Sequence, residues 1–235
     1  MKPHVICHML GPLDGRLKVE LWAPIGSDAN KVFIDEYERL HTEFKADAWL
    51  SGTTTMKEFA TGSPSKRDAP PTPPPRPWHL ADTQARHFAI GLDRHGVLHW
   101  DSPVADRGHV VVVLGRDVPD AHLAELIDAG VSYLIIDSDR IDLGWLLEAL
   151  NERLGIKRLL VEGGGTTSGA FVKEGLVDEI SLLLCPAIAG TSGQSAIFEA
   201  GADGIGNKFK LELMSATPVA AGACHMRYRV VEQPS

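Results

Sequence analysis

The second half of the chain alternates between strand-like and helix-like segments, and this alternation constrains the fold more than any other feature. "HVVVVLG" (109–115) is a continuous β-branched run, typical of a strand covered on both faces. The next segment, 120–130, has apolar residues at helical spacing and ends on Gly130, which suits a left-handed helix end. The alternation continues, with strands expected at 131–137, 157–162 and 178–186 and helices at 142–155 and 166–175. This order predicts an α/β fold with right-handed crossovers and a mostly parallel sheet between helices.

The two ends of the chain complete this sheet. "KFKLELMSA" (208–216) and "CHMRYRVV" (224–231) both alternate in polarity across a short link, which predicts a C-terminal antiparallel hairpin at one sheet edge. In the first half we expect strands at 4–10 and 46–52 around a helix of about 30–44. Residues 89–100 predict two short strands around a turn that contains Gly96.

A proline-rich segment lies between the two halves. Its proline density, over residues 61–82, disfavours both a helix and a central strand. A linker between two domains is one interpretation. We favour an extended excursion within a single domain spanning 1–235, because neither half has a complete run of crossovers.

Charge and cysteine usage limit the partners and the location. A net charge of −8 argues against nucleic-acid and anionic-membrane partners, which require a basic surface. The cysteines, Cys7, Cys185 and Cys224, are far apart in apparent strands, so we expect reduced core residues. We recognise neither a membrane-spanning apolar run nor a signal peptide, and we expect a cytoplasmic protein.

Three consecutive glycines mark the first candidate site. The expected strand runs to Glu162, Gly163 to Gly165 follow, and the expected helix opens near Thr166. Missing side chains let a ligand approach the backbone, and the helix dipole favours a phosphate or diphosphate. The stretch is neither a P-loop nor GxGxxG, because Ser168 takes the last glycine position. A tight turn that packs the helix closely remains an alternative.

Two further strand ends have residues suited to phosphate. Gly52 ends a strand and precedes three hydroxyl side chains, and Arg116 follows the strand 109–115. Three such strand ends suggest a dinucleotide with an extra phosphate. Two alternatives stay open: helix capping by the threonines and an ion pair of Arg116 with Asp117 or Asp120. The threonines are Thr53, Thr54 and Thr55.

These segments together resemble a known family. "KPHVICHMLGPLDGRL" (2–17), "LHTEFKADAWLSGTTTM" (40–56) and "LLVEGGGTTSGAFVKEGLVDEISLLLCPAIAG" (159–190) are similar to the reductase domain of riboflavin biosynthesis, in the dihydrofolate reductase-like superfamily. The resemblance covers most of the chain. It implies a three-layer αβα sandwich, NADPH as the cofactor, hydride transfer to a small substrate, and a homodimer.

The resemblance also implies residue roles. Arg116 would contact the 2′-phosphate. The diphosphate would be held by Gly163, Gly164, Gly165 and Thr166, together with Thr55, and the substrate would be bordered by Leu13, Asp14 and Gly15. The chain departs from the family at Pro12, where a serine or threonine is usual. It also has Phe59, Ala60 and Thr61 near the usual Asp-Asp-Pro motif, and residues 1–235 contain no HxE…CxxC zinc pattern of the deaminase domain that accompanies many relatives.

Two acids are candidate catalytic residues. Glu162 ends a buried strand, where desolvation would raise its pKa and keep a proton available. Asp14 is the second candidate, although Leu-Asp-Gly also forms ordinary turns, and water could deliver the proton instead. We expect His8 to be a hydrogen-bonded core residue, and we predict no metal site because the ten histidines show no metal-binding spacing.

We therefore predict an NADPH-dependent reductase that acts on a small heterocyclic substrate, such as a ribosylamino-pyrimidine or a pteridine-like compound. The alternative is a protein that binds NADP(H) without turnover, which the absent Asp-Asp-Pro motif would fit.

Overall fold

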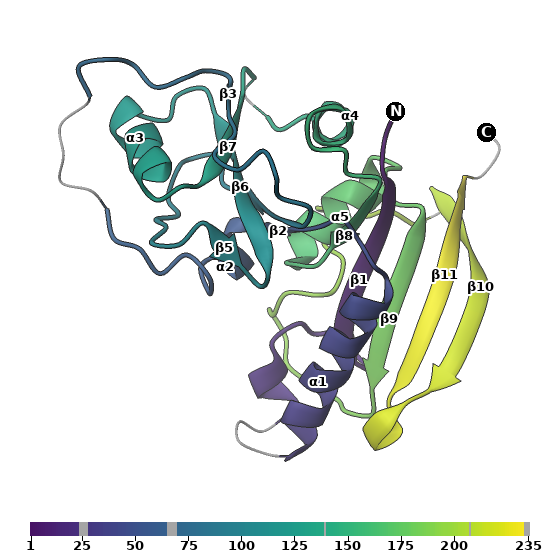
Figure 1. The fold of residues 1–235 in the computed structure, drawn as a ribbon. Coiled ribbons are helices and arrows are strands. Elements are labelled where there is room, and N and C mark those ends of the chain that lie inside the picture. Colours follow the sequence, from purple (N-terminus) through teal and green to yellow (C-terminus); the bar gives the residue numbers. More distant parts are fainter. Residues whose placement is uncertain (24–27, 65–69, 139, 207, 233–235) are drawn as a thin grey trace. The chain divides into compact units, whose positions relative to one another are not determined.

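The chain folds into two compact units. A computed structural model describes residues 1–23, 28–64, 70–138, 140–206 and 208–232. Unit 1 comprises Met1–Ala46 and Lys157–Ser235, and unit 2 comprises Asp47–Ile156. Each unit has its own strands and covering helices (Figure 1). That the whole chain acts as one domain stays a prediction. Within the described residues, no helix is both long and apolar enough to cross a membrane.

Unit 1 contains the strands from both ends of the chain. The strands lie in the order β10-β11-β9-β1-β8, with β1 parallel to β8 and β9, and the β9–β11 and β10–β11 pairs antiparallel. The predicted C-terminal hairpin at a sheet edge is therefore confirmed. The elements are β1 (His4–Pro12), η1 (Val19–Leu21), α1 (Asp28–Glu43), β8 (Arg158–Val161), α5 (Gly165–Lys173), β9 (Glu179–Cys185), β10 (Phe209–Pro218), η2 (Ala220–Gly222) and β11 (Cys224–Glu232).

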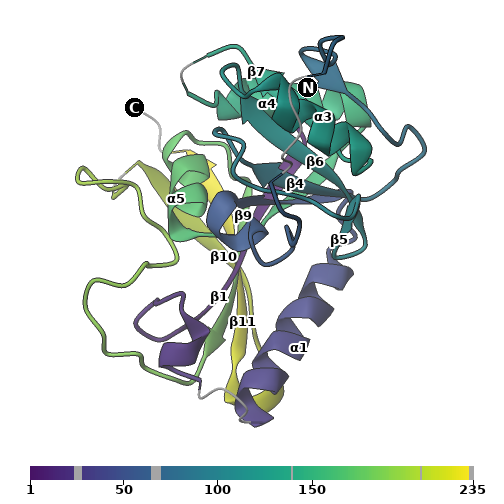
Figure 2. The same cartoon turned by 90° about the vertical axis from the view of Figure 1, so that its left-hand side faces the viewer.

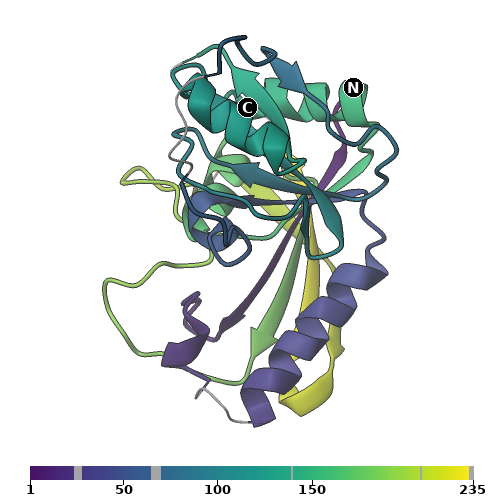
Figure 3. The same cartoon turned by 60° about the vertical axis from the view of Figure 1, so that its left-hand side comes forward.

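Helices cover both faces of the unit 1 strands. Phe33 and Leu40 of α1 pack in one apolar cluster with Leu183 and Cys185 of β9. Figure 2 shows α1 and α5 on opposite sides of these strands, and α1 runs alongside β11 in both Figure 2 and Figure 3. Burial of the apolar stripe of α1 against the sheet stabilises this layer.

Unit 2 is built mainly from parallel strands. They lie in the order β2-β4-β6-β7-β3, and the β2–β4, β4–β6 and β6–β7 pairs are parallel. Two short strands, β3 and β5, pair antiparallel with β7 and β6. The elements are β2 (Ala48–Gly52), α2 (Thr53–Met56), β3 (Trp78–His79), β4 (Phe88–Leu92), β5 (Val104–Ala105), β6 (Gly108–Gly115), α3 (Asp120–Asp128), β7 (Ser132–Ile136) and α4 (Leu143–Leu154).

The centre of unit 2 is the β-branched run predicted as a two-sided strand. Every residue of β6 is buried, and the apolar faces of α3 and α4 are buried as well. Figure 1 shows these two helices on opposite sides of β6 and β7. Mostly parallel strands between helices, with antiparallel strands at the C-terminus, confirm the predicted fold class.

Glycines end the helices as predicted. Gly130, Gly155 and Gly175 follow α3, α4 and α5 with φ of 71°, 69° and 67°. A left-handed residue at this position turns the chain away from the helix axis at no steric cost to glycine. The start of α4 has a side-chain cap, because the Asp142 carboxylate accepts a hydrogen bond from Trp145 N at 2.9 Å.

Two predictions from the sequence are wrong. Residues 97–100 form no strand, and β4 pairs in parallel with β2 and β6 instead of forming a hairpin. The Asp93 carboxylate accepts a hydrogen bond from Leu98 N at 2.8 Å, which holds the chain in a compact turn. All three cysteines are free, but Cys224 is half-buried and so is not a core residue.

Candidate functional site

The three glycines after β8 have different surroundings. Gly164 is the N-cap of α5, with φ 58° and ψ 129°, and no side chain caps the helix. Among the described residues other than its chain neighbours, only the Thr167 hydroxyl oxygen would lie within 4 Å of a Cβ built on Gly164, at 3.9 Å. The first N–H groups of a helix have no acceptor within the helix. The backbone at Gly164 is therefore open to a ligand, and the nearby amides favour an anion.

Gly165 instead makes room for another part of unit 1. A Cβ on Gly165 would lie 1.9 Å from the Ala196 carbonyl oxygen, and Glu199 N donates a hydrogen bond to Gly165 O at 2.9 Å. One turn further along α5, a Cβ on Gly169 would lie 2.2 Å from the Glu199 carbonyl oxygen. Close packing of α5 against residues 196–199 therefore explains Gly165 better than ligand binding does. The backbone at Gly164 remains accessible to a ligand.

Thr166 also contacts the segment around Glu199. The Thr166 hydroxyl donates to Glu199 Oε2 at 3.4 Å, and Glu199 Oε1 accepts a hydrogen bond from Ala196 N at 3.0 Å. A carboxylate near the start of a helix interacts favourably with the helix dipole. Sequence reasoning missed Glu199, because it is far from the glycines along the chain.

Glu162 forms a close pair that sequence reasoning also missed. Its carboxylate oxygens lie 2.9 and 3.0 Å from His41 Nδ1 of α1, a residue 121 positions away. Only 8% of the Glu162 side chain and 23% of the His41 side chain are exposed. The charge of Glu162 also acts on the thiol of Cys7. Burial raises the pKa of Cys7 to about 12, and the negative charge of Glu162 contributes to this rise. The pair can hold one proton between the imidazole and the carboxylate.

Asp14 anchors a turn. Its carboxylate accepts hydrogen bonds from Ala189 N at 3.0 Å and Gly190 N at 2.8 Å. These two amides hold the pKa of Asp14 below its usual value. Since Asp14 is therefore ionised at neutral pH, it is a poor proton donor and a good backbone anchor.

The other two predicted substrate residues lie in the same turn. Leu13 N donates to Ala187 O at 2.9 Å, and the Leu13 side chain is exposed. Gly15 has φ 68°, and its carbonyl accepts from Ile197 N at 3.0 Å. Residues 187–199 thus contact both the Leu13–Gly15 turn and the start of α5, which joins the substrate and diphosphate candidates within unit 1.

The remaining candidates lie in unit 2. Gly52 ends β2 and is the N-cap of α2, with no side-chain cap, so helix capping does not account for the threonines. The Thr53 hydroxyl donates to Leu92 O at 2.8 Å. Thr54 is exposed and Thr55 is half-buried. The hydroxyl groups of Thr54 and Thr55 are thus better placed for a ligand than that of Thr53.

Arg116 follows β6 as predicted and is about half exposed. Its guanidinium lies 3.8 Å from both Asp117 Oδ1 and Asp137 Oδ1, and 48% of its side chain is exposed. The predicted alternative partner Asp120 instead pairs with Arg76, at 2.9 Å. Because 3.8 Å is too long for a hydrogen bond, these contacts of Arg116 are weak and a bound phosphate can replace them.

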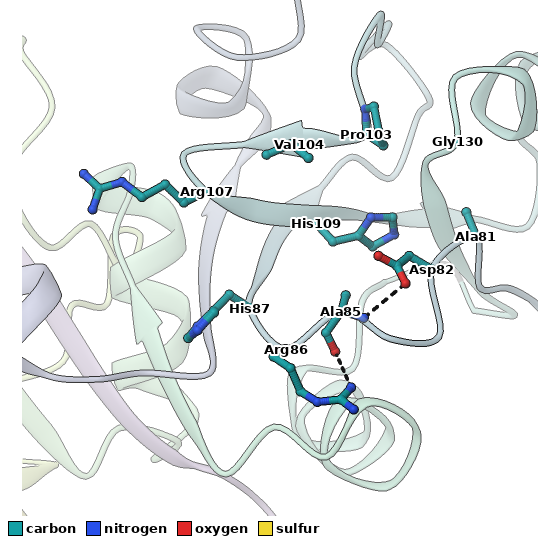
Figure 4. Close-up of a pocket in the computed structure, with 10 residues that line it drawn as sticks. All are labelled: Ala81, Asp82, Ala85, Arg86, His87, Pro103, Val104, Arg107, His109 and Gly130. Atoms are coloured by element: carbon teal, nitrogen blue, oxygen red, sulfur yellow. Dashed lines mark hydrogen bonds between the residues drawn. The ribbon is translucent and has the colours of Figure 1, made fainter.

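Unit 2 also has a cavity that none of the predicted residues lines. Its volume is about 450 Å³, and its lining includes Arg86, Arg107, His109 and Asp82. Figure 4 shows His109 pointing toward Asp82. His109 Nε2 also lies 2.7 Å from the Ser132 hydroxyl, so its imidazole is already engaged. We assign this cavity no role in the reaction.

His8 is a core residue, as predicted. It is fully buried, with Nδ1 2.9 Å from the Ser181 hydroxyl and Nε2 3.4 Å from Tyr37 O. Since a carbonyl only accepts, Nε2 carries the proton and Nδ1 accepts from Ser181. Burial lowers the pKa of His8 to about 3. His8 is therefore neutral in the native protein at physiological pH.

This burial predicts a loss of stability in acid. Between pH 6.5 and about 3 the unfolded chain protonates His8 and the native protein does not, so the free energy of unfolding falls by up to about 1.4 kcal/mol per pH unit as pH falls. Urea unfolding at pH 7 and pH 5 would measure this. The free energy of unfolding should differ between pH 7 and pH 5, and we expect this difference to be about 2 kcal/mol smaller in His8→Gln than in the unchanged protein. An equal difference in both proteins would contradict the assignment.

Three features of the structure agree with one protein family. They are the three glycines after the parallel strand β8, the mostly parallel sheet between helices, and the C-terminal hairpin of β10 and β11. Residues 3–225 match the RibD C-terminal domain. The chain therefore belongs to the RibD C-terminal domain family. Together with relatives that are named reductases, this match identifies it as an oxidoreductase.

Two of the similar proteins share one enzyme name with each other. The chain is 26% identical over 219 residues to the 2,5-diamino-6-ribosylamino-4(3H)-pyrimidinone 5′-phosphate reductase of Methanothermobacter thermautotrophicus, covering 91% of this chain and 92% of that protein. It is 33% identical over 85 residues to the reductase of the same name from Archaeoglobus fulgidus, covering 36% and 38%.

Solved structures share the fold. A pyrimidine reductase-like protein of Corynebacterium diphtheriae superimposes with a TM-score of 0.70 at 19% identity, covering 98% of this chain and 93% of that one. RibD of Acinetobacter baumannii gives a TM-score of 0.66 at 24% identity, covering 98% of this chain and 58% of that one.

Proposed function

We propose that this protein is an NADPH-dependent reductase that transfers a hydride to a ribosylamino-pyrimidinone 5′-phosphate. The observation that carries the proposal is the open backbone of Gly164 at the start of α5. The absence of a side chain lets a diphosphate approach the backbone closely, and the helix N-terminus favours its negative charge. The substrate class is supported by the name of the relative that matches along almost the whole chain.

Residues in each unit, taken separately, have features suited to a phosphate group of NADPH. In unit 1, Gly164 and the first amides of α5 would hold the diphosphate, while Gly165 packs against Ala196. In unit 2, Arg116 would hold the 2′-phosphate, because its guanidinium is half exposed and its contacts with Asp117 and Asp137 are long. Bound NADPH would supply the hydride.

The substrate chemistry requires one proton as well as the hydride. A ribosylamine opens to an imine, hydride adds to the imine carbon, and the nitrogen takes a proton to give an amino-ribitol side chain. We propose that the Glu162–His41 pair supplies this proton, because it is a nearly buried acid–base pair at the end of β8. For Asp14 we propose a positioning role. Its carboxylate accepts hydrogen bonds from Ala189 N and Gly190 N, which holds the Leu13–Gly15 turn, the proposed border of the substrate, in place.

From the family resemblance, we also propose that residues 1–235 act as one domain in a cytoplasmic homodimer. Sedimentation of the purified protein would measure the oligomeric state. A monomer at micromolar concentration would contradict this part of the proposal.

NADPH consumption tests the reductase against a protein that binds NADP(H) without turnover. We expect the absorbance of reduced nicotinamide to decrease when 2,5-diamino-6-ribosylamino-pyrimidinone 5′-phosphate is added, and to stay constant without it. A protein that binds NADPH tightly but consumes none with this substrate or related pyrimidines would support the binding protein.

Replacing Arg116 tests the cofactor preference. In Arg116→Ala we expect affinity for NADPH to fall about 10- to 100-fold, because a charge-assisted contact of about 1.5–3 kcal/mol is lost, while NADH binding is unchanged. Fluorescence titration with both cofactors measures this. Asp117→Asn is the matched control, since it removes a competing carboxylate 3.8 Å from Arg116 and should leave NADPH binding equal or tighter. An equal loss for both cofactors would remove Arg116 from the phosphate site.

A further inference from the structure

A cluster of potential metal ligands lies in unit 2, outside the proposed reductase site. It consists of His99, in the chain after β4, and His122 and Glu125 of α3. Each of the three offers one ligand atom, and these atoms all lie within 4.8 Å of one another. His122 and Glu125 are three positions apart on a helix, which places them on the same face.

The three side chains are largely shielded from solvent. His122 is 7% exposed, and the exposed fractions of the His99 and Glu125 side chains are 23% and 12%. His99 Nδ1 lies 2.6 Å from Glu125 Oε1, and the two imidazole rings have centroids 5.3 Å apart and are nearly perpendicular. A nearly buried group of two imidazoles and one carboxylate has the composition of a site for a borderline cation such as Zn²⁺.

Two buried polar atoms of this region have incomplete hydrogen bonding within the part of the chain that the structure describes. Among the described residues, neither His122 Nε2 nor Asp93 Oδ1 has a hydrogen-bond partner, although both atoms are buried. Buried nitrogen and oxygen atoms are normally hydrogen-bonded, so each such atom needs an explanation. A hydrogen-bonded His99–Glu125 pair explains those two residues but leaves His122 Nε2 unsatisfied. A cation would satisfy a ring nitrogen directly.

Carboxylates accompany the His122 ring. The ligand atom of Glu125 lies within 4.8 Å of that of His122, and the buried carboxylate of Asp93 lies in the chain between β4 and His99. These carboxylates would compensate the charge of a bound cation.

The geometry requires only small movements. Ligand atoms about 2.0–2.2 Å from a tetrahedral Zn²⁺ are about 3.4 Å from one another. The longest separation here is below 4.8 Å, and the 2.6 Å contact between His99 and Glu125 would open slightly as its shared proton is displaced. The side chains of His99 and Glu125 have room to rotate about their torsions, because neither is fully buried.

We propose that His99, His122 and Glu125 bind one Zn²⁺-type cation per chain, with Asp93 or water completing the coordination. The cation would attach the chain after β4 to α3 within unit 2. The same stretch already contacts the end of β6, because Gly115 N donates to Arg94 O at 2.9 Å. The site would therefore stabilise the chain that contacts the end of β6, and the proposal does not rest on the proposed reductase activity.

Metal titration of the full-length protein tests the site. We expect one Zn²⁺ per chain in competition with a chromophoric chelator, release of a proton on binding, and a rise in the thermal midpoint. Co²⁺ in place of Zn²⁺ should give the intense visible absorption of a four-coordinate site. In His122→Gln and Glu125→Gln, we expect affinity to fall at least tenfold.

His95→Gln is the matched control, because His95 is an exposed imidazole in the same turn. It should bind Zn²⁺ like the unchanged protein. If His122→Gln fails to fold, the less buried Glu125 decides the question through Glu125→Gln. No stoichiometric Zn²⁺ binding, or equal affinity in Glu125→Gln and the unchanged protein, would overturn the proposal.

Discussion

Gly165→Ala is expected to destabilise the protein by about 3 kcal/mol or more, because the new Cβ would lie 1.9 Å from the Ala196 carbonyl oxygen. The clash is with backbone, so no side chain can rotate away. Relief requires residues 196–199 to move, and this movement would break the hydrogen bond from Glu199 N to Gly165 O. Urea unfolding followed by circular dichroism measures the loss.

Two glycines of unit 1 provide controls for Gly165→Ala. Among the described residues other than its chain neighbour, no heavy atom would lie within 4 Å of a Cβ on Gly206. Gly206 also has no positive φ, so Gly206→Ala should change the free energy of unfolding by less than about 0.5 kcal/mol. Gly175 has equal space but φ 67°, and Gly175→Ala should lose about 1 kcal/mol from backbone strain alone. If Gly165→Ala is as stable as Gly206→Ala, the packing account of Gly165 is wrong.

Gly164→Asp is expected to abolish NADPH binding in the micromolar range. The aspartate places a negative charge where we propose the diphosphate lies, and two such charges about 5 Å apart repel by about 3 kcal/mol at an effective dielectric constant of about 20. The open surroundings of Gly164 leave room for the side chain, but φ 58° strains any residue other than glycine, so circular dichroism would first check that the variant folds. Fluorescence titration with NADPH measures the affinity.

Gly164→Asn separates charge from bulk. Asparagine has nearly the shape of aspartate and suffers the same strain at φ 58°, but it is neutral. We expect Gly164→Asn to bind NADPH more weakly than the unchanged protein and at least tenfold more tightly than Gly164→Asp. Equal affinity in the two variants would show that no phosphate lies near Gly164.

The fold could be predicted from the sequence where local pattern and burial agree. The run 110–113 contains only valines, and such a run is stable as a strand when helices cover both faces, as α3 and α4 do. Gly130 and Gly155 could be placed at helix ends because few other residues adopt their backbone conformation. Residues 97–100 were predicted wrongly because the Asp93–Leu98 hydrogen bond, rather than strand pairing, determines their path.

The candidate site could be predicted only in part. The position of Gly164 at a strand end follows from the order of elements. That Gly165 faces Ala196, and that Glu162 faces His41, depends on tertiary contacts between distant segments, which no local pattern reveals. The same is true of His99 and His122, whose separation along the chain hides their proximity, although the i, i+3 spacing of His122 and Glu125 was a weak signal.

The most direct test of the central claim follows the hydride itself. The protein would be incubated with the ribosylamino-pyrimidinone phosphate and NADPH that carries deuterium at both reactive positions of the nicotinamide, and the product would be analysed by mass spectrometry. We predict one deuterium per product molecule, on the carbon that joins the ribityl chain to nitrogen. Unlabelled product, or unchanged substrate beside intact NADPH, would contradict the assignment of this protein as an NADPH-dependent reductase of that substrate.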